Sequence, residues 1–275
     1  MTPIDPQLRA LDIDIPAMPD VLVQLSLLLA EDEVSLPAVS QLIERDMALA
    51  SAVLRAVNSS LYGLPGRVQS VHQATTYLGT REITGITFEL GLRAAFPPAD
   101  ELEAVWQRAG QRGLLMGRLA QAMGLDAWAA HSAGLFEECG KAVLFRHAPD
   151  DYRGFLRETA TDADLMALEL ARFGVTHDAL GAALCETWGL GAVAVASVRH
   201  HVTAQDSLQL PPPPVHRSAL ALSVIVQAIM GPSPDAVDDV VAEIAPQAEL
   251  DQALCLRAAR KLAEQLAAAR AHGRA

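Results

Sequence analysis

Apolar side chains recur at helical spacing along almost the whole chain. Three early stretches show apolar residues three or four positions apart: Val21, Leu22, Leu25, Leu28 and Leu29; Val39, Leu42 and Ile43; and Leu49, Val53, Leu54 and Val57. Such spacing places the apolar residues on one face of an α-helix. No stretch alternates apolar and polar residues as a half-buried strand does. The pattern predicts an all-α fold.

Proline and glycine mark where these helices end. Leu64-Pro65-Gly66 predicts a turn, Gly79-Thr80 separates two helical stretches, and Pro211 to Pro214 cannot lie inside a helix. Phe96 to Asp100 is the strongest candidate boundary, because two prolines stop a helix and acidic residues open the next. We expect an N-terminal helical lobe over residues 1–98 and a larger helical lobe over residues 99–275. The short Pro-Pro link predicts that the two lobes pack as one unit.

Composition narrows the class of protein further. Of the 275 residues, 51% are hydrophobic and 20% are charged, which is typical of a globular chain with a sizeable core. The formal net charge of −12 disfavours binding to nucleic acid through bulk charge and docking on an anionic membrane. The N-terminus lacks the pattern of a signal peptide, and the most apolar run, residues 21–30, is too short to span a bilayer. We expect a soluble, cytoplasmic protein without a nucleic-acid or membrane partner.

The cysteines offer no obvious chemistry. Cys139, Cys185 and Cys255 lie far apart and form no CxxC pair, which argues against a cysteine zinc site. Their small, odd number suits reduced thiols. Cys139 lies on an apolar helix with no histidine at a local activating position. We therefore expect all three to be small core residues.

Five segments carry more information than the helical pattern: His131 to Leu144, Phe173 to Leu184, Glu186 to Leu190, Arg199 to His201, and Asn58 to Gly63. In their order and spacing along the chain they resemble the HDOD family, the HD-related output domain of bacterial signalling proteins. The resemblance covers roughly residues 15–201 and, more weakly, the C-terminal helices. The positions that carry the family pattern are Asn58, Ser59, Tyr62, Gly63, Gly140, Lys141 and Trp188.

The resemblance implies an all-helical fold whose second lobe is related to the helical core of HD-type metal phosphohydrolases. It also implies a family generally regarded as lacking their catalytic metal site. The His-Asp pair of an HD enzyme falls on Glu137 and Glu138, and Arg108 stands where such enzymes usually place their first histidine. An arginine stays protonated and cannot ligate a metal. His177, His200 and His201 occupy positions that resemble later histidines of the family.

Two interpretations of these positions remain. One is a metal site built from Glu137, Glu138, His177 and either His200 or His201. The other, which we favour, is a structural polar cluster in which Arg108 pairs with Glu137 or Glu138, because buried charges must be paired. In a variant of the second, Glu137 is more exposed and pairs with Lys141, one helical turn on.

Other family positions have structural interpretations. Asn58 and Ser59 are predicted to make capping and turn hydrogen bonds at a helix end rather than to bind a ligand. Trp188 is predicted to pack in the core, with its indole N–H bound to one partner.

The function expected from this resemblance is non-catalytic signal transduction in a bacterium, through protein–protein contacts and without a cofactor or bound metal. The chain carries no recognisable sensor, receiver or cyclase domain, so its partner is expected to be an unidentified signalling protein on another chain. The alternative is a metal-dependent phosphohydrolase acting on a nucleotide or phosphoester. A third hypothesis is a sensor that binds a small molecule between the lobes.

Overall fold

The computed structural model describes residues 13–29, 34–59, 62, 68–211, 217–231 and 236–272. These residues form helices joined by short connections, and the described ranges contain no β-strand, which confirms the all-α prediction. Gly63, the predicted turn at Leu64-Pro65-Gly66, and Pro212 to Pro214 lie outside the described residues. The contacts within the chain divide it into two compact units, unit 1 and unit 2.

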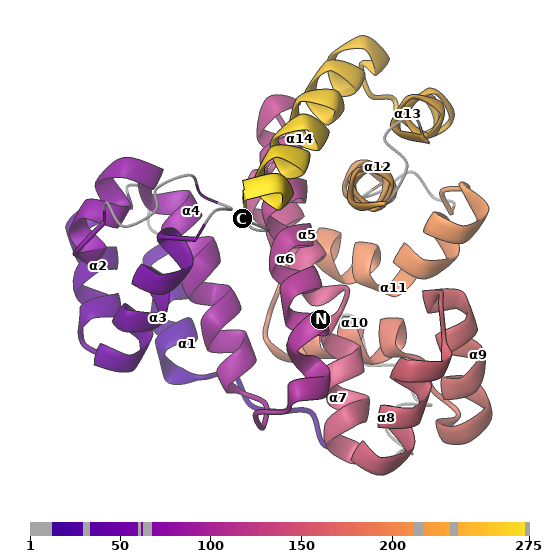
Figure 1. Ribbon diagram of the computed structural model, residues 1–275, viewed down its shortest axis with the longest axis horizontal. Helices are drawn as coiled ribbons and strands as arrows, with labels where there is room; N and C mark the ends of the chain where they lie inside the picture. Colours follow the sequence, from indigo (N-terminus) through magenta and orange to yellow (C-terminus); the bar gives the residue numbers. More distant parts are fainter. Residues whose placement is uncertain are drawn as a thin grey trace. The chain divides into compact units, whose positions relative to one another are not determined.

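Unit 2 comprises residues Met18–Ala95 and Ala263–Ala275. Its first four helices are α1 (Asp20–Leu29), α2 (Leu36–Glu44), α3 (Met47–Val57) and α4 (Val71–Ala94), drawn in indigo to violet in Figure 1. Helix α4 packs against each of the other three. The apolar stripes seen in the sequence meet in this core, where the side chains of Leu22, Leu25, Ile43 and Val53 are fully buried.

Short polar side chains start three of these helices. The carboxylate of Asp46 accepts the backbone N–H groups of Ala48 and Leu49 at the start of α3, and the hydroxyl of Ser70 accepts that of Gln73 at the start of α4. At α2, Ser35 is the N-cap and a proline lies in the first turn, as that sequence predicts. The helix boundaries in unit 2 therefore follow from local sequence.

Helix α4 is bent at Gly79. This glycine has φ +81° and ψ 164°, outside the helical region, within an otherwise continuous run of helix. A side chain at this position would be strained at that positive φ. The break between two helical stretches predicted at Gly79-Thr80 is confirmed.

Unit 1 comprises residues Met1–Ala17 and Phe96–Leu262. It contains a 3₁₀ turn, η2 (Asp100–Leu102), followed by α5 (Glu103–Ala122), α6 (Ala127–Phe136), α7 (Cys139–His147), α8 (Pro149–Glu158), α9 (Asp162–Phe173), α10 (His177–Thr187), α11 (Ala192–Ser207), α12 (Arg217–Met230) and α13 (Ala236–Gln247). Helix α14 (Gln252–His272) begins among the residues of unit 1 and ends among those of unit 2.

The limit between the units after Ala95 falls next to the Phe96-Pro97-Pro98 link. Separate lobes over residues 1–98 and 99–275, packed as one unit, stay a prediction.

Each helix of unit 1 packs against one or more other helices of the unit, around one core. Helix α5 lies along α6, α10 packs against α7 and α11, and α12 packs against α5, α11 and α13 (Figure 1). Fully buried apolar side chains fill the space between them, including Leu119, Phe136, Leu184, Val198 and Ile225. This arrangement brings α5, the α6–α7 junction, α9 and α12 together around the polar residues described below.

Glycines allow two of these helix pairs to approach closely. A Cβ atom on Gly140 of α7 would lie 1.8 Å from the backbone oxygen of His177 at the start of α10. A Cβ atom on Gly134 of α6 would lie 2.8 Å from the sulfur of Met116 on α5. Gly140, one of the family-pattern positions, is thus a residue of close helix packing.

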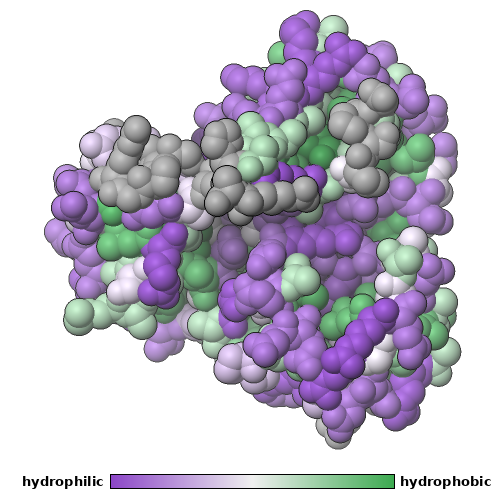
Figure 2. Space-filling view, viewed as in Figure 1, coloured by the Kyte–Doolittle hydropathy of each residue, from purple (hydrophilic) through white to green (hydrophobic). Residues whose placement is uncertain are grey.

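No helix in the described ranges is both long enough and apolar enough to cross a bilayer. On the face shown in Figure 2, the surface of unit 1 is mostly hydrophilic.

The cysteines are buried and unpaired, as expected of core residues.

Candidate functional site

Two glutamates lie at the junction between α6 and α7. Asp126 caps the start of α6, which ends at Phe136, so that Glu137 follows the last turn and Glu138 precedes the first turn of α7. Both side chains are fully buried. Carboxylates buried to this degree require cations or hydrogen-bond donors around them.

Arg108 on α5 supplies one of these cations. Its Nε atom lies 2.7 Å from Oε1 of Glu138, and its Nη2 donates to Oδ2 of Asp162, the first residue of α9, at 2.7 Å. The expected ion pair between Arg108 and Glu138 is therefore present. The Arg108 side chain is nevertheless 35% exposed, so it lies at the edge of the cluster rather than filling its centre.

The central cation is Arg112, which the sequence analysis missed. Its side chain is fully buried one helical turn after Arg108, with Nη1 3.0 Å from Oε2 of Glu137 and Nε 3.4 Å from Oε1 of Glu138. Its Nη2 donates to the side-chain oxygen of Gln227 on α12. The spacing of four residues from Arg108 places both on one helix face, which is the signal that could have identified it.

Lys141 is the third cation. Its ammonium group lies 2.6 Å from Oε2 of Glu138 and 2.7 Å from Oδ1 of Asp162, and the side chain is almost completely buried. The predicted exposed pairing of Lys141 with Glu137 was therefore wrong, because Lys141 pairs with Glu138 and with Asp162 of α9 instead. We call Arg108, Arg112, Glu137, Glu138, Lys141 and Asp162 the ion-pair cluster.

The carboxylates of the ion-pair cluster differ in protonation. Burial alone would raise the pKa of Glu138 and of Asp162, but Lys141 and Arg108 outweigh it and lower both values. At Glu137, burial dominates over the attraction of Arg112 and raises the pKa to about 7. Glu138 and Asp162 are thus ionised at neutral pH, whereas Glu137 is poised near its midpoint.

His177 belongs to a separate buried network. Its Nδ1 lies 2.8 Å from Oε2 of Glu169 on α9, and its backbone N–H donates to the same carboxylate oxygen. The hydroxyl of Tyr152 on α8 also donates to Glu169, at 2.5 Å. Glu169 was not predicted, although its spacing of four residues from the buried Leu165 places it on the inward face of α9.

His201 lies beside His177, and His200 does not. The two buried rings are 5.7 Å apart between centroids, whereas His200 is exposed. Nδ1 of His201 faces the carbonyl oxygen of Val198 at 2.7 Å, so this nitrogen carries the proton. Burial lowers the pKa of His201 to about 3, which keeps its ring neutral. In the described structure the Nε2 atoms of His177 and His201 are buried without a hydrogen-bond partner.

The residues present do not fit the divalent metal of HD-type phosphohydrolases. A metal needs carboxylate oxygens and imidazole nitrogens that are open to it. Glu137 and Glu138 are instead held by Arg112, Arg108 and Lys141. Each of the two Nε2 atoms could act as a metal ligand, but no three His, Cys, Asp or Glu side chains of the described ranges are arranged to hold a metal ion.

The remaining family positions make structural contacts. The side-chain amide of Asn58, at the end of α3, donates to the carbonyl oxygens of Leu54 and Val68 and its oxygen accepts the N–H of Val68. These are the capping and turn hydrogen bonds predicted for it, and the backbone N–H of Ser59 continues the same turn. Trp188 is buried, and its indole N–H donates to the carbonyl oxygen of Pro16 at 2.9 Å, as expected. Tyr62 is partly buried.

One curated relative is similar in sequence. An uncharacterized protein of Treponema pallidum (strain Nichols) is 28% identical over 193 residues, which cover 68% of this chain and 37% of the relative. The chain therefore spans little more than a third of the length of that protein.

Solved structures share the fold. A "putative signal transduction protein" from Marinobacter aquaeolei VT8 superposes with a TM-score of 0.71 at 24% identity, covering 96% of this chain and 62% of that one. A "putative phosphohydrolase" from Shewanella amazonensis SB2B superposes with a TM-score of 0.66 at 17% identity, covering 91% and 94%. At these identities the likeness concerns the fold alone.

The family model of the HDOD domain matches residues 15–204, which is more than half of the chain and includes α5, the α6–α7 junction and both buried histidines. This chain belongs to the HDOD domain family.

Proposed function

We propose that this chain is a non-catalytic signal-transduction domain that acts in the bacterial cytoplasm through contacts with other proteins. The observation that carries the proposal is the ion-pair cluster. The resemblance places Glu137 and Glu138 where HD enzymes have metal ligands, and each of these carboxylates has an arginine or lysine nitrogen within 3.0 Å. Metal-dependent hydrolysis requires a metal with an open position for water. Here a metal would have to displace two guanidinium groups and an ammonium group.

A metal-dependent phosphohydrolase remains the second candidate. The observation that favours it is the pair of buried Nε2 atoms on His177 and His201, which have no hydrogen-bond partner in the described ranges. Two imidazoles are fewer ligands than a catalytic site normally supplies. The carboxylates that would complete the set are those held by Arg112, Arg108 and Lys141.

The decisive experiment measures metal content and hydrolysis on the same protein. Purified full-length chain is incubated with Mn²⁺, desalted and analysed for bound metal, and then assayed with bis(p-nitrophenyl) phosphate. We expect far less than one metal per chain and no hydrolysis above a blank without protein. About one metal per chain, lost together with turnover in His177→Ala and His201→Ala, would establish the enzyme instead.

The partner is tested by affinity capture from the source bacterium, followed by reconstitution of the complex from purified components. Exposed apolar side chains on unit 2, including Leu27, Met47 and Tyr77, offer area of the kind that protein interfaces bury. The proposal expects a complex that re-forms from the two purified proteins. Failure of every captured candidate to re-form a complex would contradict it.

A further inference from the structure

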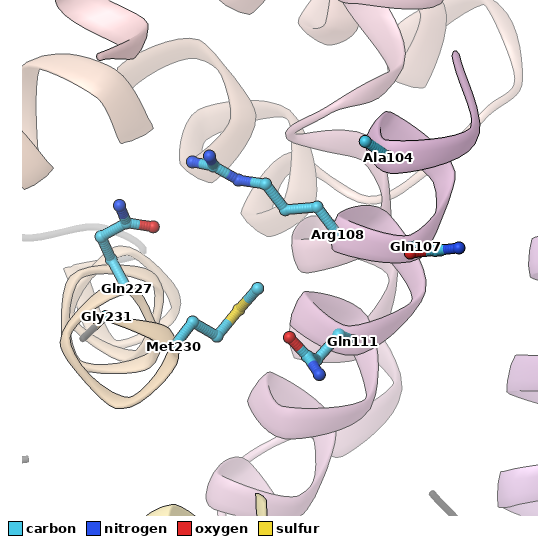
Figure 3. A pocket seen from close by; sticks show the side chains of 7 residues that line it. All are labelled: Ala104, Gln107, Arg108, Gln111, Gln227, Met230 and Gly231. Atoms are coloured by element: carbon cyan, nitrogen blue, oxygen red, sulfur yellow. The ribbon is translucent and has the colours of Figure 1, made fainter. Parts of the chain in front are cut away.

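A polar pocket opens between α5 and α12, next to the ion-pair cluster and entirely within unit 1. Its volume is about 340 Å³, and its walls include Arg108, Gln107 and Gln111 from α5 and Gln227 and Met230 from α12. In Figure 3 the side chain of Arg108 extends from α5 toward α12, and Gln227 and Met230 face it from the other wall. Neither the metal-site hypothesis nor the proposed contacts with other proteins give this pocket a role.

Arg108 brings unused hydrogen-bond donors to the pocket. Its Nε and Nη2 atoms lie against Glu138 and Asp162, which leaves Nη1 without a partner in the described structure. The side chain is 35% exposed, so this third nitrogen can be reached from solvent. A guanidinium with a free N–H edge is suited to bind an oxyanion.

The glutamines add further groups. Arg112 can only donate, so the oxygen of Gln227 must face it, and the NH₂ of Gln227 is left without an acceptor in the described ranges. The Gln111 amide makes no hydrogen bond to any described residue. Gln107 donates from Nε2 to Glu103, and in Figure 3 its side chain points away from α12. The pocket thus combines one cation with amides that both donate and accept.

The charge around Arg108 also favours an anion. The ion-pair cluster holds three cations and three carboxylates. Because burial raises the pKa of Glu137 to about 7, that carboxylate is partly protonated at neutral pH, and the cluster carries a small positive excess. The carboxylates that contact Arg108 are those of Glu138 and Asp162, each 2.7 Å from one of its nitrogens, and Glu103 accepts a hydrogen bond from Gln107.

We propose that this pocket binds a small polar molecule through an oxyanion group, a phosphate or a carboxylate, held by Arg108 and Gln227. The amide of Gln111 binds the polar remainder of the ligand. A volume of about 340 Å³ lies at the lower end of small-molecule sites, which fits a metabolite rather than a peptide or a nucleic acid. The amides of Gln111 and Gln227 and the guanidinium of Arg108 surround one methionine, which makes the wall too polar for an apolar ligand.

The test titrates three probes into ¹⁵N-labelled full-length protein: inorganic phosphate, adenosine monophosphate and succinate. Sodium chloride at matched ionic strength is the control for bulk charge. We expect at least one probe, at up to about 10 mM, to shift the side-chain amide signals of Gln111 and Gln227 to saturation. The probe that binds most tightly distinguishes a free phosphate, a phosphate ester and a carboxylate as the source of the oxyanion.

Variants locate the bound probe. Gln111→Ala removes one amide and should weaken binding about fivefold, and Met230→Trp fills the pocket and should abolish binding. Gln121→Ala changes an exposed glutamine later on α5, outside the pocket, and should leave binding unchanged. Circular dichroism melts confirm that each variant is folded.

Two results would overturn the proposal. One is the absence of a saturable shift with all three probes. The other is saturable binding that Gln111→Ala and Met230→Trp leave unchanged, since the anion would then bind elsewhere. Neither result depends on whether the chain hydrolyses phosphoesters or binds a protein partner.

Discussion

Two arginines one helical turn apart have different roles in the ion-pair cluster. Arg112 is fully buried between Glu137 and Glu138, whereas Arg108 is 35% exposed and also reaches Asp162. Breaking a buried pair leaves an uncompensated charge away from water, while solvent screens a charge at the edge. The burial of the two residues, and not their identical chemistry, determines what each contributes to stability.

We therefore predict different costs for the two alanine substitutions. Arg112→Ala should lower the free energy of unfolding by about 3–5 kcal/mol, and Arg108→Ala by about 1 kcal/mol or less. Guanidinium denaturation followed by tryptophan fluorescence measures both, because Trp106, Trp128 and Trp188 all lie in unit 1. If Arg112→Ala does not fold, the double variant Arg112→Met with Glu137→Leu should recover a folded protein, since it removes both charges. Equal losses for the two single variants would contradict the assignment.

The site was only partly predictable at the residue scale. Glu137, Glu138 and Arg108 could be placed from the order of segments, and the Arg108–Glu138 pair is present. The partners from other helices could not, because Arg112 meets Gln227 115 residues later and Arg108 meets Asp162 54 residues later. Local spacing says nothing about which distant helix supplies a partner. It could have indicated Arg112, by its position four residues from Arg108.

At the scale of elements, helix starts and breaks were predictable because their causes are local. Ser35, Asp46 and Ser70 cap helices through their own side chains, and Gly79 breaks α4 through its own backbone angles. Crossings between helices have a different origin. Gly140 matters because α10 passes so near α7 that a methyl group has no space, and no local pattern predicts that distance.

The crossing can be tested by adding one methyl group. Gly140→Ala should destabilise unit 1 by about 1–3 kcal/mol or more, because its Cβ would lie 1.8 Å from the backbone oxygen of His177. Gly154→Ala is the matched control. It lies within α8, and its added Cβ would have nothing closer than a carboxylate oxygen of Glu158 at 4.0 Å.

In this control, alanine's higher helix propensity should leave stability unchanged or raise it by up to about 1 kcal/mol. Thermal melts of the two variants and the wild type measure the difference. A Gly140→Ala protein as stable as Gly154→Ala would show that the helices separate at little cost.

At the scale of the whole molecule, two opposing protonation effects shape how stability depends on pH. Lys141 and Arg108 lower the pKa of Glu138 and Asp162 despite their burial, so their contribution is present at neutral pH and is lost as the pH falls into the acid range. Burial raises the pKa of Glu137, so its contribution has the opposite sign. The measured curve of the wild type is the sum of both, together with the other titrating groups of an acidic chain of net charge −12.

Glu137→Gln separates the two effects, because it removes one titrating group and keeps the shape of the side chain. Burial raises the pKa of Glu137 to about 7, from an ordinary value of 4.5. Its contribution to stability is therefore complete below about pH 4.5 and is lost as the pH rises through about 7. The wild type should therefore lose about 2–3 kcal/mol of unfolding free energy relative to Glu137→Gln between pH 5 and pH 8. Denaturation of both proteins across this range, followed by tryptophan fluorescence, measures the difference. A constant difference would mean that Arg112 keeps Glu137 ionised throughout. The cluster would then be neutral at pH 7, without the positive excess that favours an anion in the neighbouring pocket.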